Sequence, residues 1–330
     1  MEYTHLGRTG LRVSRLCLGT MNFGPNTDEA DAFRIMDCAL DAGINFFDTA
    51  NMYGDRNGGH RGWTEEILGR WFAQGGGRRE RVVLATKVFE DMRDPADGPN
   101  GAPGLSAYKI RRHLEGSLKR LQTDHVELYY MHNPPSHAGW DELWGVFEAL
   151  CAQGKTGYIG CSNFAAYQIA LAQNQAASRH FLGLVCSQTK YNLMCRLPEL
   201  ELIPAAQALG LGFLAWGPLQ GGMLSGSVLR ELQSGQRSAK YAGALSAQIL
   251  SKLQAFSALC QGLGRTESDV ATAWLLQRPG LTAPLLGPRT VQQLKTSLRA
   301  AELVLPPEVL ARLDEIFPGP GGPAPRAYFL

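Results

Sequence analysis

The sequence predicts an α/β protein built on one (β/α)8 barrel over residues 1–330, with an N-terminal β-hairpin and extra C-terminal helices. Short apolar runs alternate with longer amphipathic stretches eight times along the chain. Most of these runs are continuously apolar, which is typical of parallel strands buried on both faces. A doubly wound open sheet has the same local pattern, but eight units without a linker favour closure into a barrel.

A hairpin is predicted before the first barrel strand. Thr4–Ser14 contains Gly7 and Gly10 between polar and apolar residues, a pattern typical of two short strands joined by a turn. The barrel strands are then predicted at the apolar runs that follow. They are Leu16–Phe23, Asn45–Thr49, Val82–Val88, Val126–His132, Thr156–Cys161, Leu184–Tyr191, Gly212–Trp216 and Leu281–Gly287.

The stretches between the strands have helical spacing. Ala32, Ile35 and Met36 lie three or four residues apart, which places them on one helical face. Ser106 is a predicted N-cap, and Thr64 with two glutamates behind it also indicates a helix start. The predicted helices are Asp28–Ala42, Thr64–Phe72, Ser106–Leu121, Trp140–Gln153, Ala165–Ala176, Pro198–Leu209, Glu267–Gln277, Thr290–Ala300 and Glu308–Ile316.

Two segments are predicted to be irregular. The long connection Leu219–Leu245 follows the seventh strand and carries several glycines and Lys240. It has the length to fold over a bound cofactor, or it is a loop without a role. The tail 318–330 begins with the Gly- and Pro-rich stretch Pro318–Pro325, which favours irregular structure.

Composition excludes several classes of protein. With 32 Lys and Arg against 30 Asp and Glu, the net charge of +2 does not indicate a nucleic-acid-binding protein. Seven cysteines without a CxxC spacing predict reduced thiols and a cytoplasmic location. The chain shows no signal peptide pattern and no apolar run of the roughly 18 residues that a membrane span needs, so we expect no membrane partner. His113, His125 and His137 lack the spacing of metal ligands, so no metal is expected.

Ionisable side chains gather at the carboxyl ends of three consecutive predicted strands. Asp48, Lys87 and His132 occupy these ends, and Tyr53 follows the first of them. Because barrel enzymes carry their active sites at this end, we expect the four side chains to converge. A buried Asp–Lys pair would lower the pKa of Tyr53 and make it a general acid, and His132 would polarise a carbonyl group. Taken singly, Asp48 with Lys87 could be a structural ion pair and His132 a core histidine.

This ordered set resembles the catalytic tetrad of the aldo-keto reductase superfamily. Ser162, Asn163 and Gln188 resemble the residues that bind the nicotinamide carboxamide in that family, and Trp216 resembles its stacking aromatic ring. The resemblance covers nearly the whole chain. It implies cofactor contacts from Gly19, Thr20, Met21, Asp48, Ser162, Asn163, Gln188, Trp216, Pro218, Leu219, Gly221, Lys240, Gly287, Arg289, Gln293 and Ser297.

The cofactor implied by the resemblance is NADPH. No GxGxxG motif follows a strand and opens a helix, which agrees with a nucleotide site other than a Rossmann fold. Gly287-Pro288-Arg289-Thr290 resembles the adenosine-phosphate segment of the family, and Arg289 would contact the 2′-phosphate. The alternatives are a solvated Arg289 and a Trp216 that only packs on the barrel.

A narrower resemblance suggests the substrate. The segments 70–80, 204–208, 287–290 and 298–303 resemble actinobacterial TDP-4-keto-6-deoxyhexose 2,3-reductases of macrolide deoxysugar pathways. This resemblance implies reduction at C3 of a nucleotide-linked keto sugar after loss of the C2 hydroxyl, within the biosynthesis of deoxysugars for antibiotics. The chain departs from many relatives at Asn133-Pro134-Pro135 and at Thr296-Ser297, and the second departure affects a possible adenine contact.

Two other functions fit the same residues. A general reductase of small aldehydes and ketones needs the same tetrad. Some relatives of the superfamily act as cofactor-sensing regulatory subunits of potassium channels, although the complete tetrad favours an enzyme. The sequence does not predict an oligomeric state.

Overall fold

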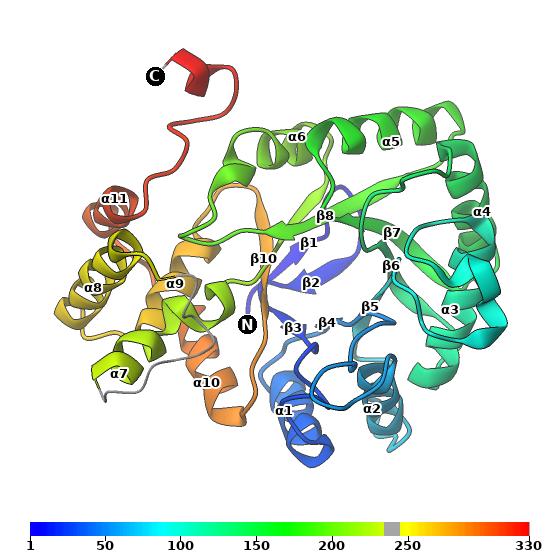
Figure 1. Ribbon diagram of the computed structural model, residues 1–330, viewed down its shortest axis with the longest axis horizontal. Helices are drawn as coiled ribbons and strands as arrows, with labels where there is room; N and C mark the ends of the chain where they lie inside the picture. The colour runs from blue at the N-terminus through cyan, green and yellow to red at the C-terminus, as the bar shows by residue number, and fades with distance from the viewer. Residues whose placement is uncertain (234–244, 330) are drawn as a thin grey trace.

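The computed structural model describes residues 1–233 and 245–329 and contains a closed barrel of eight parallel strands surrounded by helices (Figure 1). This confirms the predicted fold class. Each strand pairs with its neighbours in parallel register, so all eight carboxyl ends meet at one end of the barrel. The order around the barrel is β10 (Leu281–Leu286), β3 (Cys17–Gly19), β4 (Phe46–Asp48), β5 (Val83–Val88), β6 (Val126–Met131), β7 (Thr156–Ser162), β8 (Leu184–Lys190) and β9 (Gly212–Trp216).

Helices cover the outside of the barrel and bury one apolar face each against the strands. Eight of them follow the barrel strands: α1 (Glu29–Asp41), α2 (Trp63–Phe72), α3 (Ala107–Leu121), α4 (Trp140–Ala152), α5 (Ala166–Ser178), α6 (Leu202–Ala208), α9 (Glu267–Leu276) and α10 (Val291–Ala300). Further helices are α7 (Ser227–Gln233), α8 (Ala247–Gly262) and α11 (Pro307–Ile316). Short 3-10 segments are η1 (Pro95–Gly101), η2 (Leu197–Glu199), η3 (Gln220–Ser225) and η5 (Arg326–Phe329).

The predicted hairpin consists of β1 (Tyr3–His5) and β2 (Arg12–Ser14) and closes the amino-terminal end of the barrel. Its Leu6 and Val13 join the apolar cluster inside the barrel. Gly7 has φ +58°, and a Cβ there would lie 2.6 Å from the carbonyl oxygens of Gly210 and Val185. A glycine is therefore required for the hairpin turn to approach the barrel this closely.

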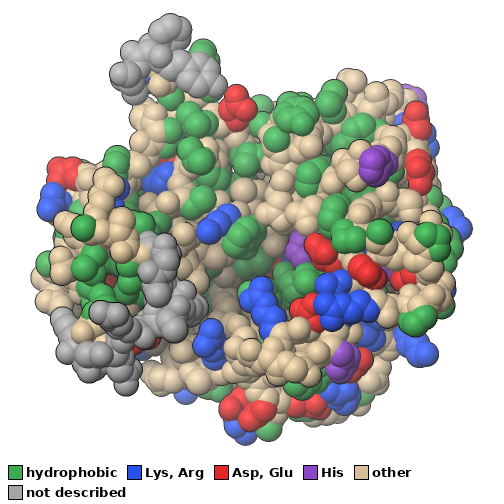
Figure 2. Space-filling view, in the orientation of Figure 1, with side chains coloured by type: hydrophobic (Ala, Val, Ile, Leu, Met, Phe, Trp, Pro, Cys, Tyr) green, Lys and Arg blue, Asp and Glu red, His purple; other side chains and the backbone are tan. Residues whose placement is uncertain are grey.

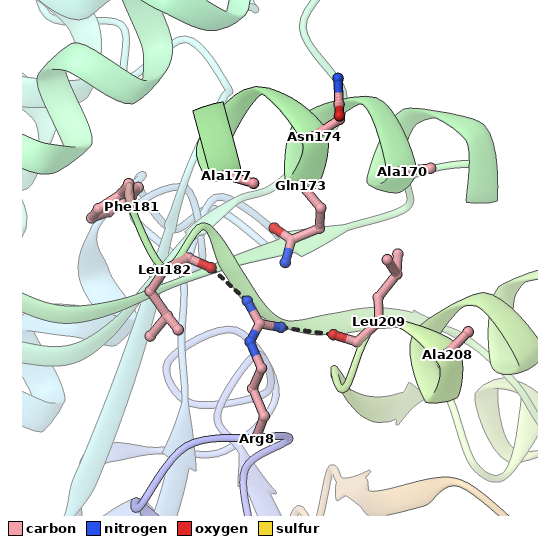
Figure 3. A pocket seen from close by; sticks show the side chains of 9 residues that line it. All are labelled: Arg8, Ala170, Gln173, Asn174, Ala177, Phe181, Leu182, Ala208 and Leu209. Atoms are coloured by element: carbon pink, nitrogen blue, oxygen red, sulfur yellow. Dashed lines mark hydrogen bonds between the residues drawn. The ribbon is translucent and has the colours of Figure 1, made fainter. Parts of the chain in front are cut away.

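Arg8 fastens the same turn to the strands. Its guanidinium donates to the carbonyl oxygens of Leu182, at 2.5 Å, and Leu209, at 2.8 Å (Figure 3). A cavity of about 600 Å³ lies beside this contact, lined by Arg8 and by residues of α5 and α6 such as Gln173 and Ala208. The cavity is at the end of the barrel opposite the carboxyl ends of the strands.

Helix starts show where the sequence patterns succeed and fail. Asp28 caps α1 and Ser106 caps α3, as their side chains accept from backbone N–H groups of the first turn. The predicted start at Thr64 is wrong, because α2 begins at Trp63 after Gly62. The Thr64 hydroxyl is buried and donates instead to the carbonyl of Phe23, which joins α2 to the loop after β3.

The sequence analysis missed two helices between the seventh strand and the helix before β10, namely α7, within the connection Leu219–Leu245, and the longer α8. The buried residues of α8 include Leu253, Phe256 and Cys260, at helical spacing. The helix packs against both α9 and α11, so its apolar residues cover more than one face and the periodic signal is weak. The first strand is also shorter than predicted, since the chain turns after Gly19.

The C-terminal segment after α11 leaves the body of the molecule (Figure 1). Residues 318–325 contain no helix or strand, and a cis peptide bond precedes Pro325. The Ala324 N–H donates to the carbonyl of Leu200, which ties the segment to the start of α6. Among residues 1–233 and 245–329, no helix is both long enough and apolar enough to cross a membrane.

Candidate active site

Four side chains meet at the carboxyl ends of β4, β5 and β6. Asp48 is the last residue of β4, Lys87 lies in β5, and His132 follows β6 directly. The buried Lys87 ammonium pairs with the Asp48 carboxylate and lies 3.4 Å from the Tyr53 hydroxyl. The rings of Tyr53 and His132 meet edge to face at 5.9 Å. The structure thus brings together all four residues that the sequence analysis selected.

Lys87 also shapes the turn that presents Tyr53. Its ammonium donates to the carbonyl of Thr49 at 2.8 Å, and its own backbone carbonyl accepts from the Asn51 N–H. Gly54, with φ +120°, follows Tyr53, and a Cβ at Gly54 would lie 2.6 Å from the carbonyl of His60. The turn therefore folds tightly between β5 and the start of α2, and the phenol stays beside the ammonium.

Lys87 remains charged in this environment. Burial by itself lowers the pKa of Lys87, but the Asp48 carboxylate and the Tyr53 hydroxyl raise that pKa overall. Gln188 donates to the second oxygen of Asp48 at 2.8 Å, so both carboxylate oxygens have partners. The added hydrogen bonds from Lys87 to Thr49 and from Gln188 to Asp48 offset part of the cost of burying these two charges.

The predicted lowering of the Tyr53 pKa is wrong. Burial raises the pKa of Tyr53 above its ordinary value, and the nearby Asp48 charge adds to the effect. Lys87 lowers it, but not enough to compensate. Tyr53 is therefore a neutral phenol that carries its proton at physiological pH, next to a cation able to stabilise a phenolate.

His132 is neutral for a similar reason. Burial, together with the charge of Lys87, lowers its pKa to about 3. Its Nδ1 is buried and has no hydrogen-bond partner among the described residues. A neutral imidazole carries one ring N–H, so His132 beside Tyr53 can donate a hydrogen bond to an entering polar group.

A set of amide side chains extends the site along β7, β8 and β9. The Trp216 indole N–H donates to Asn163 Oδ1 at 3.0 Å, and Asn163 Nδ2 donates to the carbonyl of His132 at 3.0 Å. Asn163 holds this position with φ +63°, a conformation that asparagine tolerates better than most residues. Ser162 lies buried next to Asn163 at the end of β7, and the Gln188 amide donates a hydrogen bond to the Asp48 carboxylate.

The loop after β3 lies next to Asp48. Thr20 is buried and donates to the Asp48 carbonyl through both its N–H and its hydroxyl, at 3.0 and 2.9 Å. Gly19 ends β3 against β10, where a Cβ would lie 3.0 Å from the carbonyl of Leu286. Met21 is 42% exposed at the same end of the barrel.

The predicted cofactor residues after β9 line a glycine-rich turn. Pro218 is buried, Leu219 is half-buried and Gly221 is exposed. Asn192 supports the turn, because its amide donates to the carbonyl of Gly217 and to Gln220. Lys240 lies outside the described residues.

The segment after β10 offers an exposed cation at a helix start. Asn22 donates to the carbonyl of Gly287 and holds this segment beside the loop after β3. Thr290 caps α10, the Arg289 N–H donates to the Gln293 side chain at 2.8 Å, and Ser297 lies one helical turn further on. The exposed Arg289 guanidinium makes no hydrogen bond or ion pair with any residue that the structure describes.

These residues fit a phosphate-bearing nucleotide. The positive end of the helix dipole repels an arginine at the N-terminus of a helix. The guanidinium and the helix N-terminus both attract a phosphate group, so a bound phosphate would offset this repulsion. The face of the molecule in Figure 2 is hollowed over the barrel strands, with Lys, Arg and His side chains around the hollow. Among the described residues, no group of three or more His, Cys, Asp or Glu side chains is placed to hold a metal ion.

Comparison with known proteins agrees with this arrangement. The model of the aldo/keto reductase family matches residues 15–317, which is most of the chain. The chain belongs to the aldo/keto reductase family. It is thus an oxidoreductase that acts on carbonyl groups, in a family that generally uses NAD(P)H.

Relatives of this aldo/keto reductase span nearly its whole length. It is 59% identical to the uncharacterized oxidoreductase YrpG of Bacillus subtilis, over 99% of both chains. It is 31% identical to a probable voltage-gated potassium channel subunit beta of Oryza sativa, over 96% of both chains. It is 30% identical to the aldo-keto reductase AMT2 of Alternaria alternata, over 95% of this chain and 90% of that one.

Some residues around the site of this reductase were not expected from its sequence. Asn51 and Asn192 anchor loops at the site, and no motif indicated them. Tyr191, just beyond the end of β8, is buried and donates a hydrogen bond to Glu199, so its ring does not line the site. Trp63 is partly buried at the start of α2, and Phe89 is partly buried in the loop after β5.

Proposed function

We propose that this reductase transfers hydride from NADPH to a ketone, with Tyr53 as the proton donor. The observation that carries the proposal is the contact of the Tyr53 hydroxyl with Lys87, beside neutral His132. A phenol that keeps its proton until an alkoxide forms is suited to general acid catalysis.

Residues at the strand ends would hold the cofactor. Ser162, Asn163 and Gln188 would bind the carboxamide, and Trp216 would stack on the ring. Arg289 would pair with the 2′-phosphate, since guanidinium groups bind phosphate with two hydrogen bonds. The remaining contacts would come from the loops after β3, β9 and β10. When bound, the reduced nicotinamide supplies the hydride for the carbonyl carbon.

The chain's own groups do the rest of the chemistry. His132, uncharged, would donate one hydrogen bond to the carbonyl oxygen and orient it. As negative charge develops on that oxygen, Tyr53 would pass its proton to it. Lys87 would then stabilise the phenolate that remains, and Asp48 would keep the ammonium in place.

The substrate we propose is a TDP-linked 4-keto-6-deoxyhexose that has lost its C2 hydroxyl and therefore carries a ketone at C3, which is the group that is reduced. The support is the likeness of segments 70–80, 204–208, 287–290 and 298–303 to reductases of deoxysugar pathways. We further propose that residues 1–330 act as one domain in the cytoplasm.

Fluorescence titration with NADPH and NADH is the first test, since Trp216 should report binding by quenching. Initial rates are then measured with the keto-sugar nucleotide and with a panel of small aldehydes and ketones. Tighter binding of NADPH and a kcat/KM at least tenfold higher for the sugar nucleotide would support the proposal. Equal rates across the panel would indicate a general reductase, and no reduction of any carbonyl would overturn the function.

A further inference from the structure

A buried chain of hydrogen bonds leads from the loop after β5 to the turn that carries Tyr53. Asp97 in η1, His113 in α3 and Asn51 after β4 are 4%, 5% and 0% exposed. His113 Nε2 lies 3.1 Å from Asp97 Oδ2, and His113 Nδ1 lies 3.2 Å from Asn51 Nδ2. Arg112 pairs with Asp97 at the outer end. These contacts join three segments that are far apart in the sequence.

The partners determine how His113 is protonated. Hydrogen bonds from Arg112 and His113 hold the pKa of Asp97 below its ordinary value, although burial alone would raise it. Asp97 is thus a carboxylate, and His113 Nε2 must carry the hydrogen that faces it. Burial, with the charges of Lys109 and Arg120, lowers the pKa of His113, so Nδ1 is an unprotonated acceptor. The Asn51 amide N–H then donates to Nδ1.

Asn51 connects this chain of hydrogen bonds to Lys87. Its backbone N–H donates to the carbonyl of Lys87 at 3.2 Å, and the Tyr53 N–H donates to the carbonyl of Ala50 at 3.1 Å. The turn around Tyr53 is therefore held from two sides, by Lys87 on the barrel side and by His113 on the helix side.

We propose that Asp97, His113 and Asn51 form a relay that positions the Tyr53 turn against Lys87. Loss of the relay would let the phenol move away from the lysine ammonium and the reacting oxygen. These three are positioning residues, and the reacting proton comes from Tyr53. The kinetic consequence rests on the proposed function, whereas the positioning can be measured without turnover.

Two substitutions of His113 separate the relay from mere packing. His113→Asn places an amide oxygen near the position of Nδ1 and keeps an acceptor for Asn51. His113→Gln places an amide N–H near Nε2 and keeps the contact with Asp97, but it removes the acceptor. We expect His113→Gln to lower kcat roughly ten- to hundredfold, as a displacement of about 1 Å does, with an unchanged Kd for NADPH. In the wild type Asp97 acts by fixing the tautomer of His113, whereas the Asn amide oxygen is an acceptor without that contact, so His113→Asn should stay within about threefold of wild type in kcat.

Tyr129→Phe is the matched control. It removes a buried hydrogen bond from Tyr129 in β6 to the carbonyl of Ile110 in α3, the helix that also carries His113. It should lower the unfolding temperature without the loss of kcat. The position of Tyr53 is followed independently, from its ¹³Cζ signal in protein with labelled tyrosine. A Tyr53 signal that shifts in His113→Gln but not in His113→Asn supports the relay. This result stands even if the wild-type protein reduces no carbonyl compound, because that failure would overturn only the proposed function. A Tyr53 signal in His113→Gln that coincides with wild type overturns the relay.

Discussion

At the scale of single residues, neighbouring ionisable groups of the site have different protonation states. Tyr53 keeps its proton, His132 is neutral and Lys87 is charged, although buried Lys87 and the half-buried rings of Tyr53 and His132 lie in one cluster. Burial acts in opposite directions on acids and bases, because it disfavours whichever form is charged. The Asp48 carboxylate raises the pKa of Lys87, so this group stays charged despite its burial.

Replacement of Tyr53 tests the proton donor. We expect Tyr53→Phe to lower kcat by a factor of roughly 10² to 10⁴, the range that general acids contribute, with the Kd for NADPH within about twofold of wild type. Tyr130→Phe is the control, since Tyr130 also lies near Lys87 but points its hydroxyl at Cys186 inside the barrel. Near-normal turnover by Tyr53→Phe would remove its role.

Arg289 tests the choice of cofactor. Arg289→Ala should weaken NADPH binding by roughly ten- to hundredfold, the value of hydrogen bonds between charged groups, and leave NADH binding nearly unchanged. Lys295→Ala removes an exposed charge further along α10 and serves as the control. Equal losses for both cofactors in Arg289→Ala would contradict a contact with the 2′-phosphate.

The low pKa of His132 makes stability depend on pH. The unfolded chain protonates this histidine near its ordinary pKa of 6.5, whereas the folded protein does so only near 3. The unfolded state thus binds the extra proton first, and stability that is fully present above pH 6.5 is lost as the pH falls towards 3, at up to about 1.4 kcal/mol per pH unit. Urea unfolding between pH 7 and 4 should show a smaller loss in His132→Asn than in wild type or in the exposed control His137→Asn. Parallel losses in all three proteins would contradict this assignment.

At the scale of elements, the hairpin and the helices position the site from outside. The hairpin closes one end of the barrel and leaves the other end for the chemistry. Helix α3 carries the Asp97 partner His113 and, through Lys109, holds the carbonyls of Phe89, Gly101 and Ala102 in the loop after β5. These contacts hold the loop after β5 in place, although the barrel itself does not determine the conformation of such surface loops.

The hairpin turn provides a test at this scale. Gly7→Ala should lower the free energy of unfolding by at least about 2 kcal/mol, because Gly7 has φ +58° and a Cβ would meet three backbone atoms at 2.6 Å. Gly10→Ala, in the same hairpin, should stay within about 0.5 kcal/mol of wild type, since a Cβ there would have no described heavy atom within 4 Å. Urea unfolding measures both, and equal effects would contradict the close packing of the turn.

At the scale of the whole molecule, barrel closure creates the site. Asp48, Lys87 and His132 come from strands that pair in sequence order, whereas Arg289 comes from the last strand's end. Only closure of β10 against β3 brings Arg289 to the loop after β3, where Thr27 donates to its carbonyl. In an open sheet, Arg289 after β10 and the loop after β3 would lie at opposite edges.

The barrel and the meeting of Asp48, Tyr53, Lys87 and His132 at one end of it could be predicted from the sequence, because apolar runs and polar residues at their carboxyl ends are local patterns. The sequence also indicated the hairpin and most helices, but it missed α8, whose apolar residues face two neighbouring helices. Only the tertiary structure decided the pKa direction of Tyr53, since burial depends on every element that surrounds the phenol. The same holds for the contacts of Asn51 with His113 and of His113 with Asp97, because they join segments that no local pattern relates.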